Sequence, residues 1–302
     1  MAGFRRVSFE VPQGRMAGLA WGDDTRPYEI VFLHATGFNA LTYAEMLAPL
    51  GERFHVLALD ARGHGRTELP TRRFGYTSWN RHRDDLIAVL DKLPASATLA
   101  GHSMGATVSL LVAGKRPDLV RSLALLEPVI LAPGRYSTLE LPGMPYLMRH
   151  FFPIARQAAR RRASFLSRDV AAEQLRGRGF FKGFSEETLR NYLEDGLVDE
   201  PGGGVRLACS PAWEAATFAG QRHDPWGALM RAPKTIVILR AEKDSSLAPS
   251  VAERIKMLRP DVRLATVEGA THALPMERPD RARAAIETAA MTATRGAFAD
   301  IA

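Results

Sequence analysis

Residues 98–114 read TLAGHSMGATVSLLVAG and place Ser103 between two glycines. A short apolar run precedes the serine, and a stretch of helical character follows it. A buried strand that turns sharply into a helix would present the serine at the turn, and glycines at 101 and 105 would avoid a clash there. The start of the helix would place N–H groups and the positive helix dipole beside the Ser103 hydroxyl. The stretch therefore predicts a strand–turn–helix unit that carries a nucleophile.

Strand-like and helix-like segments alternate on both sides of this unit. Near-continuous apolar runs such as EIVFLHA (29–35) are typical of strands that are buried on both faces. Short connections between alternating strands and helices indicate a mostly parallel sheet with helices on both faces. We therefore predict an α/β fold with an eight-stranded sheet, its strands lying at 5–11, 15–22, 29–35, 54–60, 97–103, 120–127, 234–242 and 262–269.

The middle of the chain interrupts this alternation. Residues 131–231 contain no convincing buried strand, several prolines and glycines, and helical pieces such as SEETLRNYLEDGL (185–197). We predict that this segment is a mostly helical cap, inserted into a core formed by residues 1–130 and 232–302. Apolar and aromatic side chains of 144–155 and 178–184 are suited to line a pocket beneath such a cap, although most of them are expected to form its own core.

The composition is that of an ordinary globular protein. Of its 302 residues, 46% are hydrophobic and 24% are charged. Its single cysteine, Cys209, cannot form an internal disulfide, and spacings typical of metal sites are absent. No signal peptide and no apolar run long enough to span a membrane is visible. We expect a cytoplasmic protein without a cofactor or metal and without stable membrane insertion.

The net charge of +7 is concentrated in one segment. Residues 149–182 contain nine Arg or Lys against two acidic residues, whereas residues 183–231 contain four against eight. This distribution favours a solvated helix face. The alternative is a basic patch that lies near a substrate entrance or contacts anionic surfaces. Nothing resembles a nucleic-acid-binding module, so nucleic acid is not an expected partner. A homodimer is left open.

A serine nucleophile needs a base and an acid that orients it. Among the eight histidines, His272 lies in a loop after the last predicted strand, at the carboxyl edge where open α/β sheets place their sites. Asp244, in ILRAEKDSSLAP (238–249), is the predicted acid because it follows the preceding strand. Glu127, at the end of LALLE, is the alternative acid. Ser103, Asp244 and His272 follow the chain order Ser, Asp, His.

Five motifs in order resemble those of the α/β-hydrolase superfamily: FLHATGFNALTY, VLALDARGHGRTELP, LAGHSMGA, LRAEKDSSLAP and EGATHALPMERPD. The resemblance covers nearly all of the chain outside the insertion. It implies an oxyanion hole formed by the backbone N–H of Met104 and by one in the HATGF loop, for which Thr36 is the first candidate and Phe38 the second. It also implies that DARGHG (60–65) is a structural turn without a role in the chemistry.

The resemblance implies a hydrolase that forms an acyl-enzyme. We expect Ser103, His272 and Asp244 to cleave an ester of a small or medium, mostly apolar carboxylic acid. The same triad acting on a carbon–carbon bond, a thioester or a lactone is the first alternative, and a cofactor-free peroxidase or perhydrolase is another. A hypothesis from a different class of function is a ligand-binding receptor that does not catalyse a reaction.

Overall fold

The computed structural model describes residues 3–135 and 152–299, and its centre is a sheet of eight strands. The strand order is β1-β2-β4-β3-β5-β6-β10-β11, with antiparallel pairing only for β1 with β2 and for β2 with β4. The predicted α/β fold with eight strands is confirmed. The strands are β1 (Arg5–Val11), β2 (Gly14–Trp21), β3 (Ile30–Leu33), β4 (Val56–Leu59), β5 (Ala97–His102), β6 (Val120–Leu126), β10 (Ile236–Ala241) and β11 (Arg263–Val267).

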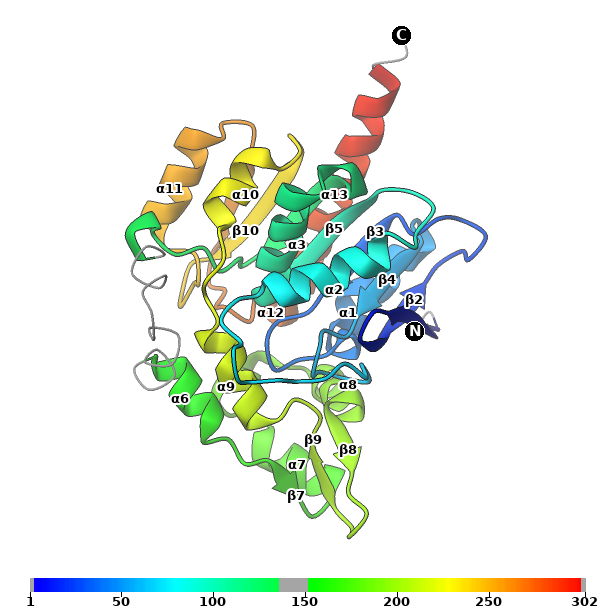
Figure 1. Ribbon diagram of the computed structural model, residues 1–302, viewed down its shortest axis with the longest axis vertical. Coiled ribbons are helices and arrows are strands. Elements are labelled where there is room, and N and C mark those ends of the chain that lie inside the picture. The colour runs from blue at the N-terminus through cyan, green and yellow to red at the C-terminus, as the bar shows by residue number, and fades with distance from the viewer. Residues whose placement is uncertain (1–2, 136–151, 300–302) are drawn as a thin grey trace.

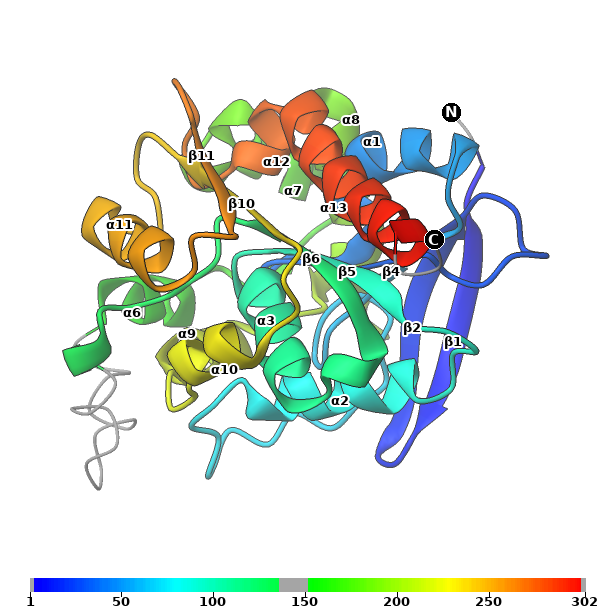
Figure 2. The same ribbon diagram turned by 90° about the horizontal axis from the view of Figure 1, so that it is seen from above.

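Helices cover both faces of this sheet (Figure 2). Alternate residues of β3 show the two faces, because Ile30 and Phe32 belong to one apolar core and Val31 and Leu33 to the other. Helices α1 (Ala44–Leu47) and α13 (Pro279–Ala299) pack on the first face. The second face carries α2 (Asn80–Leu90), α3 (Met104–Lys115), α10 (Pro225–Arg231) and α11 (Pro249–Leu258).

The predicted insertion contains helices and one small sheet, and Figure 1 shows its elements between residues 153 and 219 grouped at one end of the molecule. The sequence showed no convincing buried strand here, and the structure adds three short ones, because β7, β9 and β8 form an antiparallel sheet. Strands of two or three residues are too short to produce an alternating pattern in sequence. The elements are α6 (Pro153–Ala159), β7 (Ser164–Phe165), α7 (Arg168–Leu175), the 3₁₀ helix η4 (Gly179–Gly183), α8 (Glu186–Gly196), β8 (Leu197–Asp199), β9 (Val205–Leu207) and α9 (Pro211–Ala219).

Helix α10 groups with the core rather than with α6–α9. It packs closely on α3, where a Cβ at Gly114 would lie 2.4 Å from the Cα of Ala228. The α6–α9 segment contacts the core elsewhere, since the buried carboxylate of Asp195 on α8 accepts hydrogen bonds from Arg6 on β1 and from Arg66. The division into core and cap at residues 131 and 231 stays a prediction.

Candidate active site

The predicted strand–turn–helix unit is present at Ser103. The residue lies between β5 and α3 with φ 54° and ψ −115°, a backbone conformation that residues other than glycine rarely adopt. A Cβ at Gly105 would lie 1.9 Å from the carbonyl oxygen of Leu33, and one at Gly101 would lie 2.4 Å from the backbone of Gly105. Both glycines are therefore required, because the turn presses the start of α3 against β3 and β5.

His272 joins Ser103 to a carboxylate in one chain of hydrogen bonds. Its Nε2 lies 3.0 Å from Ser103 Oγ, and its Nδ1 lies 2.8 Å from Glu127 Oε2. The Glu127 side chain is fully buried, whereas that of His272 is 21% exposed. Because Nδ1–H donates to Glu127, Nε2 of the neutral imidazole is free to accept the serine proton.

Glu127 is held by the loop that follows β10. Its Oε1 accepts hydrogen bonds from the Ala241 N–H and the Ser245 hydroxyl, and its Oε2 accepts one from the Ser246 N–H. Burial by itself would raise the pKa of this carboxyl, but the hydrogen bond and charge interaction with His272, together with the hydrogen bonds from Ser245 and Ala241, outweigh it and leave the pKa below its usual value. Glu127 is therefore a carboxylate at neutral pH, with both oxygens fixed in place.

The first choice of acid, Asp244, does not fit this geometry. Its side chain is exposed, and among the described residues the carboxylate hydrogen-bonded to His272 is that of Glu127. The β10 loop approaches the site with Ser245 and Ser246 instead, and these bind Glu127. The alternative acid from the sequence is thus the one that the structure brings to His272.

The HATGF loop offers one unpaired amide near the serine. Phe38 N–H donates to Ala35 O, and Gly37 N–H donates to Nε2 of His64. Ala35 O also accepts from His34 Nδ1, so the peptide between Ala35 and Thr36 is fixed with its N–H on the opposite side. The N–H of Thr36 has no hydrogen-bond partner among the described residues. The geometry favours Thr36 over Phe38 as the second oxyanion amide, beside Met104 at the first turn of α3.

A second chain of hydrogen bonds, which sequence reasoning missed, links this loop to His272. Ala35 N–H donates to the hydroxyl of Tyr43, in the 3₁₀ helix η1 (Ala40–Tyr43), and that hydroxyl lies 2.8 Å from His102 Nδ1. His102 Nε2 lies 2.8 Å from the backbone carbonyl of His272. Burial lowers the pKa of His102 well below its usual value, so the ring is neutral, with Nε2 the donor and Nδ1 the acceptor. His102 therefore does more than pack beside the serine.

A cavity of about 300 Å³ opens over Ser103 and His272. Most of its wall is apolar, and residues 178–181 of the predicted lining segment 178–184 belong to it. Residues 144–151 of the other predicted lining segment lie outside the described residues. The lining residues are Ala35, Thr36, Gly37, Phe38, Ser103, Ile154, Gln157, Ala158, Arg161, Leu175, Arg178, Gly179, Phe180, Phe181, Tyr192, Glu214, Phe218 and His272.

One partly buried ion pair forms part of this wall. Arg161 donates to both carboxylate oxygens of Glu214 and to the hydroxyl of Tyr192. A Cβ at Gly37 would lie 2.4 Å from Glu214 Oε1, so the carboxylate packs directly on the HATGF loop. Arg178 also lines the cavity, but it is exposed and has no ion pair with a described residue.

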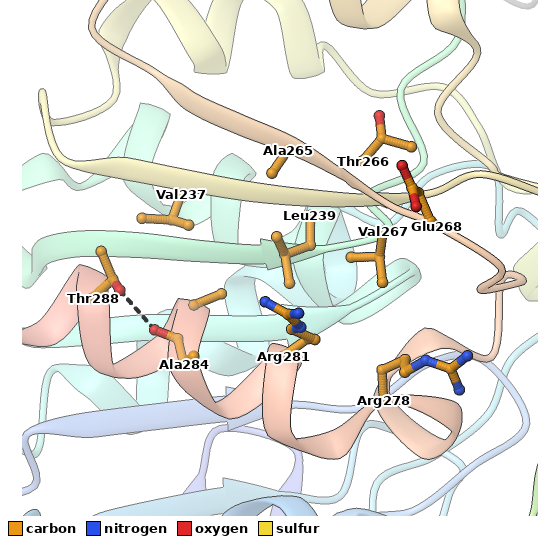
Figure 3. A pocket seen from close by; sticks show the side chains of 11 residues that line it. Val237, Leu239, Ala265, Thr266, Val267, Glu268, Arg278, Arg281, Ala284 and Thr288 are labelled. Atoms are coloured by element: carbon orange, nitrogen blue, oxygen red, sulfur yellow. Dashed lines mark hydrogen bonds between the residues drawn. The ribbon is translucent and has the colours of Figure 1, made fainter.

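A second hollow lies between β10, β11 and α13, away from Ser103 (Figure 3). Its walls include Val237 and Leu239, and it is also bordered by Arg278 and by Arg281 of α13. Within residues 3–135 and 152–299, no group of His, Cys, Asp or Glu side chains is arranged to hold a metal ion. None of the helices in the same ranges is both long enough and apolar enough to cross a membrane.

Residues 30–285 match the sequence model described as "Alpha/beta hydrolase family". The chain belongs to the α/β-hydrolase family. Its matches to named hydrolases, together with the fold, identify it as a hydrolase.

Two relatives illustrate the range of hydrolases that this α/β hydrolase resembles. It is 29% identical over 246 residues to 2-(acetamidomethylene)succinate hydrolase of Mesorhizobium japonicum, a match that covers 80% of this chain and 81% of the relative. It is 32% identical over 130 residues to an esterase of Mycobacterium tuberculosis, but that match covers only 43% of this chain and 42% of the esterase.

Solved structures show the same fold over almost the whole chain. The crystal structure of E-2-(acetamidomethylene)succinate hydrolase has a TM-score of 0.76 and 25% identity, and the match covers 94% of this chain and 98% of the other. A thioesterase domain from the curacin biosynthetic pathway also has a TM-score of 0.76, with 20% identity over 94% of this chain and 99% of the other. The second likeness concerns the fold alone.

Proposed function

We propose that the protein is a serine hydrolase that cleaves a small or medium, mostly apolar carboxylic ester through Ser103, His272 and Glu127. The observation that carries the proposal is the chain from Ser103 Oγ through the His272 ring to Glu127. Neither the strained turn nor the buried carboxylate would be needed for folding alone, since both are unfavourable in isolation. Nucleophile, base and orienting acid are the three parts that acyl transfer by serine requires.

In the first half of the reaction, His272 Nε2 accepts the proton of Ser103 as Oγ attacks the carbonyl carbon. The former carbonyl oxygen becomes an oxyanion, to which Thr36 and Met104 donate their backbone N–H groups. As the tetrahedral intermediate collapses, the bond to the alcohol oxygen breaks and His272 returns the proton to that oxygen. The acyl group is then bonded to Ser103 Oγ. Glu127 stabilises the imidazolium throughout and keeps the tautomer that accepts at Nε2.

The second half repeats these steps with water. His272 removes a proton from a water molecule, the oxygen of which attacks the acyl carbon. The bond from that carbon to Ser103 Oγ breaks, and Ser103 recovers its proton from His272. A free carboxylic acid leaves, and the enzyme returns to its starting state.

The cavity supports an apolar acyl or alcohol group of limited size. Its volume of about 300 Å³ is at the lower end of ligand pockets in general. Phe180 and Phe181 pack against Phe38 at its wall, with ring centroids 5.3 and 6.4 Å from that of Phe38. Burial of an apolar group against these rings would supply most of the binding free energy.

A panel of aryl esters with increasing acyl length tests this proposal. We expect butyryl and hexanoyl esters to have the highest kcat/KM, and palmitoyl esters to be at least roughly tenfold poorer because they exceed the cavity. Ser103→Ala should abolish turnover of all of them. Thioesters, lactones and a ketone-type carbon–carbon substrate belong in the same panel. Folded wild-type protein that turned over one of these but no ester would refute the ester proposal.

A second candidate reaction is hydrolysis of an amide that bears carboxylates. The relative that matches 80% of the chain is named for 2-(acetamidomethylene)succinate. Arg178 lines the cavity without an ion pair to a described residue, so its guanidinium is available to a substrate carboxylate. The test is to measure acetate release from 2-(acetamidomethylene)succinate by the wild type and two variants. Release that is lost in Arg178→Ala but kept in Arg176→Ala would favour this reaction. Arg176 is a suitable control because it is exposed and already pairs with Glu186.

A further inference from the structure

The hydroxyl of Thr36 is buried and has no hydrogen-bond partner among the described residues. The residue is only 4% exposed. The hydroxyl of every other buried threonine among the described residues forms a hydrogen bond. The pairs are Thr42 with Asn39, Thr98 with Ser122, Thr107 with Val129, Thr188 with Glu45 and Thr217 with Trp213. Because buried polar groups in folded proteins are almost always paired, the exception at Thr36 requires an explanation.

Thr36 lies where a substrate would reach it. It lines the same cavity as Ser103 and His272, and its own N–H is the unpaired amide of the HATGF loop. The backbone on either side is fixed by the bonds of Ala35 to Tyr43 and of Gly37 to His64. The backbone of Thr36 therefore cannot shift to bring the hydroxyl to another partner. Valine has the same shape as threonine and would fill this space without an unpaired hydroxyl, so packing alone does not explain the threonine.

We propose that the Thr36 hydroxyl is a third donor to the oxyanion, beside the backbone N–H groups of Thr36 and Met104. The inference rests on the proposed function, because it needs an acyl carbonyl bound at Ser103. A rotation about χ1 would let the O–H and the N–H of this one residue point to the same oxygen. The charge that develops on this oxygen is greatest in the transition state, so the hydroxyl would act on kcat rather than on substrate binding. Thr36 would then be a catalytic residue by its side chain as well as by its backbone.

Thr36→Val and Thr36→Ser test this role with the best ester of the panel. Thr36→Val keeps the shape and the backbone N–H but removes the donor, and we expect kcat to fall about 10²-fold with KM little changed. Thr36→Ser keeps the hydroxyl and should retain most of the activity. The inhibition constant of a trifluoromethyl ketone, which forms a tetrahedral adduct with serine, should rise in Thr36→Val by a similar factor. Binding of the product acid, which has no oxyanion at this position, should not change.

Thr98→Val is the matched control, because it removes a buried threonine hydroxyl of β5 that pairs with Ser122. It should keep wild-type kcat. If Thr36→Val does not fold, the comparison of Thr36→Ala with Thr36→Ser takes its place, since the two differ mainly by the hydroxyl. An active wild type whose Thr36→Val or Thr36→Ala variant stays within about threefold in kcat would overturn this inference alone. A folded wild type without any esterase activity would instead refute the proposed function.

Discussion

Glu127 directly follows β6 in a left-handed backbone conformation, with φ 52°. That conformation is unusual for a residue with a long side chain. It turns the carboxylate to the carboxyl edge of the sheet, where two backbone N–H groups and Ser245 fix it facing His272. The role proposed for Glu127 therefore depends on a feature of the backbone as much as on the residue type.

Substitution of the two candidate acids separates them. Glu127→Gln should lower kcat/KM by about 10²- to 10⁴-fold, because the amide removes the negative charge and can favour the wrong tautomer of His272. Asp244→Asn should leave kcat/KM within about a factor of three, since an exposed side chain away from the reacting atoms contributes little. Both values come from aryl-ester kinetics on variants whose thermal unfolding has been checked. A larger loss for Asp244→Asn would return the acid to the β10 loop.

The residues of the site were predictable from the sequence to different degrees. Ser103 and His272 could be chosen because each has a motif and a place after a strand. The acid could not be chosen with equal certainty, because Glu127 and Asp244 both follow strands that end at the same edge. Which carboxylate reaches the histidine depends on how the β10 loop folds, and the serines at 245 and 246 carried no visible signal of that in sequence.

At the scale of elements, η1 and β5 connect the two sides of the site. The bonds from Ala35 N–H to Tyr43 and from Tyr43 to His102 hold the HATGF loop, and His102 holds the backbone of His272. Loop and base are thus tied to the same rigid core. Such a link would keep the oxyanion amide and the imidazole at a fixed separation.

Tyr43→Phe should weaken this link with little change in volume. We expect kcat/KM to fall roughly ten- to a hundredfold, because a small displacement of loop or base misaligns the reacting groups. The free energy of unfolding should fall by about 1–3 kcal/mol, since the Ala35 N–H loses its acceptor. Ester kinetics and chemical denaturation give the two values.

Tyr76→Phe controls for the loss of a buried tyrosine–histidine bond. Tyr76 is also buried and lies 3.0 Å from Nδ1 of His82, but it does not line the cavity. A comparable loss of stability with near-wild-type kcat/KM is expected. Equal activity of the Tyr43 and Tyr76 variants would show that the link has no effect on the chemistry.

At the scale of the whole molecule, the site exists only when distant parts of the chain meet. Ser103 follows β5, Glu127 follows β6 and His272 follows β11, so the three side chains belong to three separate strand connections. The parallel order of β5, β6, β10 and β11 brings these ends to one edge. The cavity wall then comes largely from α6–α9, which explains why the alternation of strands and helices predicted the core but not the shape of the pocket.

The sheet could be predicted from the sequence because its strands are apolar and long enough to be recognised. Each residue of β3, β4 and β5 is buried, as their continuous apolar runs indicated. The small sheet β7–β9–β8 lacks any such signal, and the Arg161–Glu214 pair joins residues 53 positions apart. Pairings of this kind depend on tertiary packing, which no local sequence pattern predicts.

Covalent labelling of Ser103 by a fluorophosphonate tests the central claim most directly. Intact-mass spectrometry of the wild type should show the addition of one phosphonyl group, because only an activated serine attacks phosphorus rapidly. Ser103→Ala should remain unmodified, and Glu127→Gln should react far more slowly. Folded wild-type protein that stayed unlabelled, or a Ser103→Ala variant that still gained the phosphonyl group, would contradict the account.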